Sequence, residues 1–203
     1  MIEIRHMFTG EVLVRKGTIH DSESLAKMNL SFADCSSMEL NHAGFFRSNC
    51  SFASFAHSDL SQAYMNYAEL SNASFQYANL TETSFLGANL QGADLRDANV
   101  RNAMFFGADL RGARLPAPAK MLQAKWGLVS YGLCADLMEY DAYCHGDRKA
   151  FDEWAKGGPC PYRDGQVRAA NFWENRELWG KGKLCSPYDL LVRVLREKCI
   201  TDL

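Results

Sequence analysis

The sequence lacks the long apolar run that marks a membrane span or a signal peptide. No stretch of 18 apolar residues occurs, and residues 1–8 contain no apolar segment of the length that export requires. The formal net charge is only −2, which gives no general attraction to nucleic acid or to acidic membranes. We therefore expect a cytoplasmic protein that binds neither membranes nor nucleic acid directly.

Signatures of the common enzyme sites are also missing. The sequence contains no G-x-x-x-x-G-K loop, no G-x-G-x-x-G after a strand and no G-x-S-x-G turn. Candidate acids, bases and nucleophiles lie close together late in the chain, but no recognised motif organises them; they are Asp141, His145, Asp147, Asp152 and Cys160. The sequence therefore predicts no enzyme activity, no catalytic residue and no cofactor.

Close pairs of metal-binding cysteines are absent as well. The chain has seven cysteines and no C-x-x-C pair, the spacing that structural zinc sites usually show. The odd number, in a cytoplasmic protein, favours reduced thiols. A metal or catalytic site in the carboxyl-terminal part stays an alternative hypothesis, and its candidate ligands are Cys134, Cys144, His145, Cys160, Cys185 and Cys199.

What the sequence does have is a five-residue repeat from Met28 to Leu115. In 18 consecutive units a small residue, usually Ala, is followed two positions later by a large apolar one, and only Cys35 and Cys50 are smaller. A helix repeats its apolar face every 3.6 residues and a strand every 2, so a strict period of five excludes both as extended elements. A short fixed period predicts stacked coils that bury their apolar residues against one another.

The unit Ala88-Asn89-Leu90-Gln91-Gly92 resembles the A(D/N)LXX signature of the pentapeptide-repeat family. The resemblance implies a right-handed, four-sided β-helix with four units per turn, which gives about 4.5 turns here. We expect a mainly β protein in three parts: a capping hairpin at 1–25, the β-helix at 26–115 and an α-helical domain at 116–203.

Both ends of the repeat are predicted to be capped. Glu3–Phe8 and Glu11–Arg15 have the pattern of two strands around a Thr9-Gly10 turn, and a hairpin there would cover the open end of the β-helix. A helical turn is expected to start at Asp21 and lead into the repeat. After Leu115 the period stops at Pro116-Ala117-Pro118.

The carboxyl-terminal part is predicted to form five short helices. Four are expected at Ala119–Trp126, Leu133–Cys144, from Asp147 to Gly157, and Val167–Trp179. The last begins with Ser186 as N-cap and Pro187 as its first residue, and one face carries Leu190, Leu191, Val194, Leu195 and Cys199.

Segments at both ends resemble pentapeptide-repeat proteins of phages and prophages. The similar segments are Ile2–Arg5, Phe8–Leu13, Trp154–Tyr162, Arg168–Phe172 and Trp179. This resemblance implies a phage or prophage origin and a host protein as target, but it brings no activity.

Residues twenty apart should lie above one another, so outward residues can be sorted into faces. The first face is polar: Asn29, Asn49, Glu69, Asn89 and Asp109 beside Ser31, Ser51, Ser71, Gln91 and Arg111. The fourth face is apolar, and its large outward residues are Phe46, Tyr64, Tyr67, Leu86, Met104 and Phe106. A contiguous apolar patch on a surface predicts a cover, which is the chain's own tail, a second copy or a host protein.

The sequence therefore favours a non-enzymatic protein-protein interaction module. Mimicry of DNA toward a gyrase-type protein, which the family invites, is a further alternative. Mimicry needs a dense anionic surface, and residues 26–115 contain eight acids against six bases.

Overall fold

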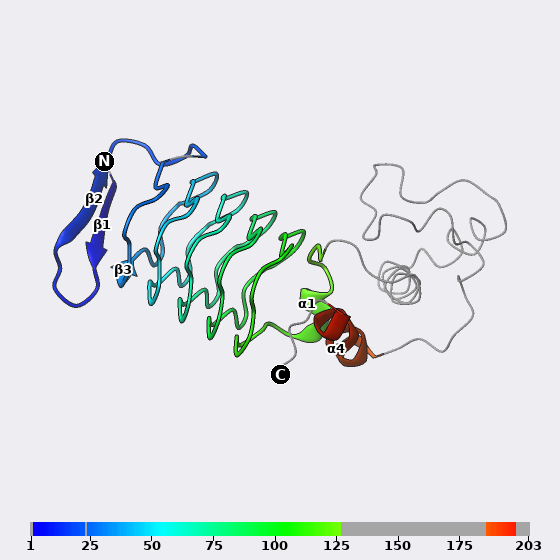
Figure 1. Ribbon diagram of the computed structural model, residues 1–203. Coiled ribbons are helices and arrows are strands. Elements are labelled where there is room, and N and C mark those ends of the chain that lie inside the picture. The colour runs from blue at the N-terminus through cyan, green and yellow to red at the C-terminus, as the bar shows by residue number, and fades with distance from the viewer. Residues whose placement is uncertain (1, 23, 127–185, 198–203) are drawn as a thin grey trace, which may run out of the picture. The chain divides into compact units, whose positions relative to one another are not determined.

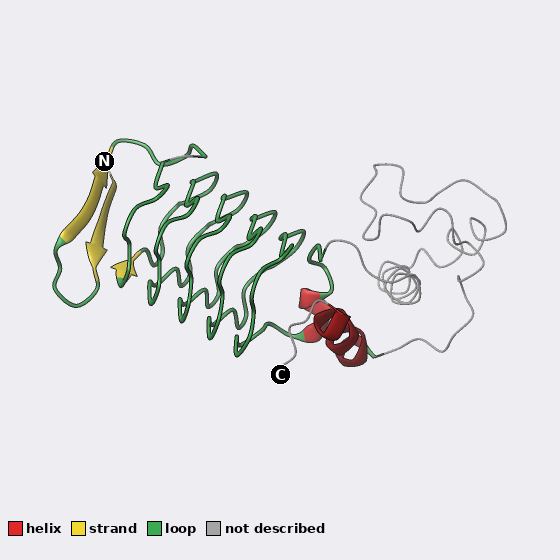
Figure 2. Ribbon diagram, viewed as in Figure 1, coloured by secondary structure: helices red, strands yellow, loops and turns green. Residues whose placement is uncertain are grey.

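The computed structural model describes residues 2–22, 24–126 and 186–197 (Figures 1 and 2). Its elements are β1 (Ile2–His6), β2 (Val12–Lys16), β3 (Ala33–Asp34), α1 (Pro118–Met121) and α4 (Pro187–Glu197). Two compact units are present: the first runs through Lys125 and contains the three strands, the repeat and α1, and the second contains α4. No helix within the described ranges is long and apolar enough to cross a membrane.

The repeat folds as a β-helix. Parallel bridges join residues twenty positions apart, from Asn29↔Asn49 to Asp94↔Arg114, so each coil uses twenty residues. Paired backbone bonds close each bridge: the Leu30 amide donates to the Asn49 carbonyl (2.7 Å), and the Asn49 amide donates to the Met28 carbonyl (2.9 Å). Successive coils therefore stack in register (Figure 2), and outward side chains line up in columns.

The predicted inward residues form the core. Large apolar residues from Leu30 to Leu110 are at most 2% exposed, and the small residues between them are buried too. Phenylalanines stack through the core, with ring centroids 5.0 Å apart for Phe55–Phe75 and 5.1 Å for Phe85–Phe105. Met28 and Met38 differ from the prediction and are only half-buried, because both lie in the first coil.

Each unit is separated from the next by a corner residue with positive φ. The repeat pattern did not predict this conformation. These corners lie two positions after each large apolar residue, from Lys27 to Gly112, with φ between 54° and 67°. A backbone bond closes most of these corners; around Phe32, the Ala33 amide donates to the Leu30 carbonyl at 3.0 Å. Fourteen corners are not glycine, and none of the fourteen is β-branched, the class that sterics penalise most in this conformation.

The predicted amino-terminal hairpin is present. β1 and β2 pair antiparallel with Ile4 opposite Val14, and β1 also pairs with β3, which covers one side of the first coil. On other sides of the first coil, side chains bond to backbone groups. Ser24 Oγ accepts from the Gly44 amide (3.1 Å), and His20 Nδ1 lies 2.8 Å from the Asn41 carbonyl. The described residues of 21–27 form a bend and turns where a helical turn was expected, and the Ser24 amide donates to the Asp21 carbonyl at 3.1 Å.

The repeat ladder extends past its predicted end. The helix expected at Ala119–Trp126 is only the four-residue α1, which begins at Pro118. The chain then returns to an extended form, and Lys125 bridges to Met104. The spacing there is 21 residues because the short helix adds one residue to the coil. The backbone stacking therefore continues past the prolines at which the five-residue period stops.

The last predicted helix is present as α4. Ser186 Oγ accepts a hydrogen bond from the Asp189 amide (3.1 Å) and donates to Asp189 Oδ2 (2.7 Å), which is the expected N-cap. Four of the five predicted core residues of this helix are buried: Leu190, Leu191, Val194 and Leu195. Cys199 and the helices predicted at 133–144, 147–157 and 167–179 lie outside the described residues.

Candidate interaction surface

The structure places the six predicted residues of the fourth face on one side of the β-helix. Bridges connect Gly44 to Tyr64, Tyr64 to Ser84, and Ser84 to Met104, which makes one column. A second column is Phe46, Asn66, Leu86 and Phe106, and a third begins with Arg47 and Tyr67. These residues therefore lie in three neighbouring columns, which Asn66 and Ser84 interrupt.

Half of these apolar side chains are clearly exposed. Tyr64 is 42% exposed, Tyr67 49% and Leu86 37%, whereas Phe46, Met104 and Phe106 are partly buried. Ser84 Oγ donates to Asn66 Oδ1 at 2.5 Å, so the two polar residues between them satisfy each other. The Ser84 hydroxyl and the Asn66 amide oxygen are thus paired within the fourth face.

Aromatic contacts hold the amino-terminal half of the fourth face in one arrangement. The rings of Phe46 and Tyr67 pack edge to face with centroids 6.0 Å apart, and Arg47 Cζ lies 5.2 Å from the Phe46 ring centroid. The Tyr67 ring lies over Gly87, where an added Cβ would come within 2.6 Å of it. Arg47 and Lys125 give the two ends of this face positive charge.

A second exposed aromatic cluster was missed. Phe32 and Phe52 stack with centroids 5.0 Å apart, and Phe8 packs against Phe32 at 5.9 Å. On another corner, His57 stacks on Tyr77 at 5.0 Å. The signal was present in the sequence as aromatic pairs twenty residues apart, but the corner columns were not recognised as outward ladders.

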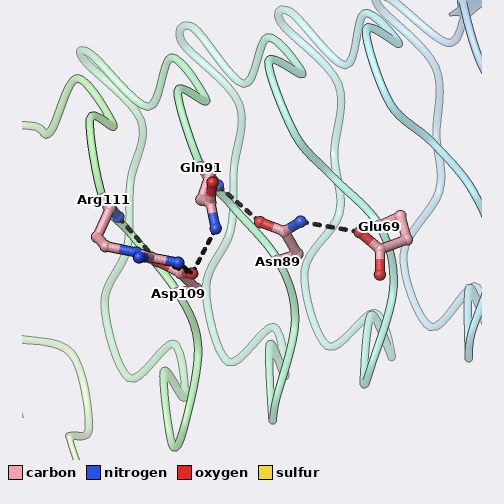
Figure 3. A network of polar contacts seen from close by, with 5 residues as sticks. All are labelled: Glu69, Asn89, Gln91, Asp109 and Arg111. Atoms are coloured by element: carbon pink, nitrogen blue, oxygen red, sulfur yellow. Dashed lines mark hydrogen bonds and ion pairs between the residues drawn. The ribbon is translucent and has the colours of Figure 1, made fainter.

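The first face carries a network of polar side chains, drawn in Figure 3. Asn89 Nδ2 donates to Glu69 Oε2 (2.9 Å), and Gln91 Nε2 donates to Asp109 Oδ2 (2.6 Å). Arg111 adds a forked ion pair to Asp109, with Nη2 2.6 Å from Oδ2. Mainly this Arg111 side-chain bond lowers the pKa of Asp109 to about 2.

Metal and catalytic chemistry have no support in the described residues. No group of three or more potential ligands lies together there. Cys35 and Cys50 are free, buried thiols; burial raises the pKa of Cys50 to about 12 and that of Cys35 well above its usual value. The other candidates lie outside the described residues: Cys134, Asp141, Cys144, His145, Asp147, Asp152, Cys160, Cys185 and Cys199.

Comparison with known families gives one match. Residues 48–85 and 83–116 match the family model of pentapeptide repeats, in eight copies. The match covers the central and later coils and leaves the hairpin and the carboxyl-terminal part outside. No curated protein shows a significant match to the chain.

Several solved pentapeptide-repeat structures are similar. One is a thylakoid-lumen protein of Arabidopsis thaliana, 24% identical over 47% of this chain and 57% of that one, with a TM-score of 0.34. Another is Rfr23 of the cyanobacterium Cyanothece, 24% identical over 46% and 63%, with a TM-score of 0.28. HetL of Nostoc, involved in heterocyst differentiation regulation, is 26% identical over 49% and 54%, with a TM-score of 0.27. This chain thus spans roughly half to two thirds of their lengths.

Proposed function

We propose that the protein is a non-enzymatic interaction module that binds a partner protein through its fourth face, and the match of residues 48–116 to the pentapeptide-repeat family model supports this proposal. The observation that carries this proposal is the exposure of Tyr64, Tyr67 and Leu86 on one flat side of a rigid β-helix. Aromatic anchors on a preorganised surface are typical of protein interfaces, since little entropy is lost when they bind.

The charges at the ends of the fourth face define the partner further. Arg47 lies at its amino-terminal end and Lys125 bridges to Met104 at its carboxyl-terminal end. A complementary partner has an apolar patch about four coils long, roughly 19 Å, with carboxylates at both ends. Carboxylates at both ends would fix the position of the partner along the β-helix, while the aromatic centre would supply most of the affinity.

The finer architecture belongs to the same proposal. We propose a right-handed, four-sided β-helix of about 4.5 turns; the twenty-residue spacing of the bridges supports four five-residue units per turn. A phage or prophage origin and a host protein as partner are proposed from the resemblance of the end segments, and a cytoplasmic location remains a proposal beside them.

The DNA-mimic alternative receives no support from the arrangement of charge. Arg96 pairs with Asp94 (2.7 Å) and Arg111 pairs with Asp109 (2.6 Å), so the carboxyl-terminal coils carry neutralised acids rather than an array of free carboxylates. The alternative of a metal or catalytic site rests on residues outside the described ranges.

Capture from a host lysate tests the proposal. Immobilised wild type should retain a host protein, Leu86→Asp should lose it because a carboxylate is placed in the apolar centre, and Gln76→Asp should keep it because Gln76 lies on another face. Melting curves check that both variants fold. Equal retention by Leu86→Asp and wild type would remove the fourth face from the binding site.

A further inference from the structure

The first face and its two borders show a gradient of side-chain size along the β-helix. We number the coils so that coils 2, 3, 4 and 5 begin at Arg47, Tyr67, Gly87 and Gly107. Four outward columns cross these coils: Arg47, Tyr67, Gly87, Gly107; Asn49, Glu69, Asn89, Asp109; Ser51, Ser71, Gln91, Arg111; and Phe52, Asn72, Gly92, Gly112. On both borders large side chains give way to glycine, and in the third column serine gives way to long side chains.

Backbone conformation alone does not explain these glycines. Gly107 and Gly112 have φ of +65° and +67°, but fourteen other corners carry side chains at similar φ. An internal reason exists at Gly87 and Gly92, where a Cβ would lie 2.6 Å from the Tyr67 ring and 2.5 Å from Asn72 Oδ1. At Gly107 and Gly112 a Cβ would come no closer than 3.9 Å to any described atom beyond the chain neighbours. Glycine there leaves room for a molecule outside the protomer.

We propose that the first face binds the first face of a second copy, with the two β-helices antiparallel about a two-fold axis between coils 3 and 4. Coil 2 then lies against the partner's coil 5, and coil 3 lies against the partner's coil 4. Large side chains meet small ones where coil 2 lies against the partner's coil 5. Phe52 lies opposite the partner's Gly112, Ser51 opposite the partner's Arg111, and Ser71 opposite the partner's Gln91. The face is thus complementary to itself, as a two-fold interface requires.

Charge is complementary in the same arrangement. The four coils carry two bases and two acids on this face: Arg47, Glu69, Asp109 and Arg111. Arg47 contacts the Phe46 ring and forms no ion pair with the described residues, and coil 2 meets the coil that contains the partner's Asp109–Arg111 pair. Glu69 lies opposite the partner's Asn89, and Asn49 opposite the partner's Asp109. Within the protomer Asn89 Nδ2 donates to Glu69 and Asn49 Nδ2 donates to Asn29, so each carboxylate of the partner faces an amide that has a second N–H to donate.

The neighbouring registers are disfavoured for two different reasons. Sliding one copy by a coil in one direction places Glu69 opposite the partner's Glu69, and like charges set opposite each other across an interface oppose association. Sliding it in the other direction places Glu69 opposite the partner's Asp109, whose charge Arg111 already offsets. That second register loses the fit of Phe52 against the partner's Gly112, so side-chain size rather than charge disfavours it.

The size of the contact indicates a weak dimer. Four columns over four coils give about sixteen residues per protomer, four of them glycine, which is below the roughly 20 to 30 residues of a standard interface. We expect a dissociation constant in about the micromolar range. Self-association by this face goes beyond the proposed partner binding and uses mainly different residues.

A pair of cysteines tests the antiparallel geometry. Ser51 and Arg111 lie three coils apart, about 14 Å along the β-helix, which is too far for a disulfide within one chain. Ser51→Cys combined with Arg111→Cys should therefore form a covalent dimer on oxidation. The matched control combines Ser36→Cys with Arg96→Cys, which have the same sixty-residue spacing on another face, and Arg96 pairs with Asp94 as Arg111 pairs with Asp109. Equal cross-linking of both pairs, or none for the first, would overturn the proposal.

Sedimentation velocity over a concentration series tests the size complementarity. Phe52→Gly should raise the dimer dissociation constant by about tenfold or more, because it empties the contact with the partner's Gly112. Tyr77→Gly is its control: Phe52 and Tyr77 are both exposed corners, with φ of 61° and 59°, and each stacks on a ring 5.0 Å away. Tyr77→Gly should change the constant by less than about twofold.

Three other results of the sedimentation series would contradict dimerisation through the first face. A wild type that stays monomeric at every concentration, or equal effects of Phe52→Gly and Tyr77→Gly, would overturn the proposal. Loss of the dimer in Leu86→Asp but not in Phe52→Gly would place the second copy on the fourth face instead. Because glycine fits a positive-φ corner, misfolding of Phe52→Gly is not expected, and its melting curve checks this.

Discussion

The ring of Tyr67 lies directly over Gly87, so close that a Cβ added at Gly87 would be 2.6 Å from Tyr67 Cε1. The same φ occurs one coil later at Gly107, where an added Cβ would only approach the Gly87 backbone at 4.0 Å. The two glycines thus share a conformation but differ in what covers them.

Gly87→Ala should therefore disturb the fourth face, whereas Gly107→Ala should not. Each substitution places a side chain at positive φ, at a cost of about 1 to 2 kcal/mol. Only Gly87→Ala must also displace the Tyr67 ring. Denaturant unfolding and partner binding of both variants measure the two effects separately. Equal partner affinity for the two would show that the position of Tyr67 is unimportant.

The positive-φ corners should tolerate glycine better than a β-branched residue. At the exposed corner Ser37, with φ of 56°, valine should cost about 1 to 2 kcal/mol because a β-branched side chain clashes there. Ser37→Gly should leave the free energy of unfolding within about 1 kcal/mol of wild type, since relief of strain and added chain entropy oppose each other. Urea unfolding of the three proteins measures this order, and a valine variant as stable as the glycine variant would contradict the corner assignment.

The aromatic stack in the core predicts a large loss for one truncation. Phe85 is fully buried and stacks on Phe105, so Phe85→Ala should lower the free energy of unfolding by about 3 to 5 kcal/mol. Outward Gln76→Ala should stay within about 0.5 kcal/mol of wild type. Similar losses for the two in chemical unfolding would mean that the inward register is wrong.

The Asp109 carboxyl should titrate at unusually low pH. Its folded pKa of about 2 lies below the unfolded value, so its favourable contribution to stability is present above the unfolded pKa and is lost as pH falls toward 2. Arg111→Gln should raise this pKa, because the forked ion pair is its main cause. Carboxyl-carbon NMR titration of both proteins reads the pKa directly, and an unchanged value in Arg111→Gln would reject that cause.

Reduced thiols give a chemical prediction. Cys35 and Cys50 should resist alkylation in the folded protein, because both are buried and their pKa values are raised. After unfolding without reductant, all seven cysteines should be labelled in the mass spectrum. Elemental analysis should find no zinc; one zinc per chain would support the alternative of a metal site.

The period of five predicted stacked coils and their core because burial repeats with the sequence, and the resemblance to pentapeptide repeats predicted that the coils form a β-helix. The large apolar residues from Leu30 to Leu110 occupy the same position of the five-residue unit, so one choice of register predicts that all of them point inward. The corners escaped prediction because residues as different as Phe52, Glu82 and Asp97 all adopt positive φ there. Stacking of Lys125 on Met104 was missed because that segment keeps the backbone ladder without the repeat's side chains.

The position of the fourth face was predictable from the sequence, but the packing of its side chains was not. Its six apolar residues follow from the twenty-residue columns. The packing of Tyr67 on Phe46 and over Gly87 depends on side-chain direction, which a repeat pattern does not contain. The gradient of the first face was visible in the sequence, but it has meaning only when a second copy is turned antiparallel.

Calorimetric titration of the captured partner tests the binding role of the fourth face most directly. Wild type and Gln76→Asp should bind with the same dissociation constant, and Leu86→Asp should bind about tenfold or more weakly, because it places a charge in the apolar centre of the surface. Equal affinity of Leu86→Asp and wild type, with both proteins folded, would contradict the claim that this face is where the protein acts.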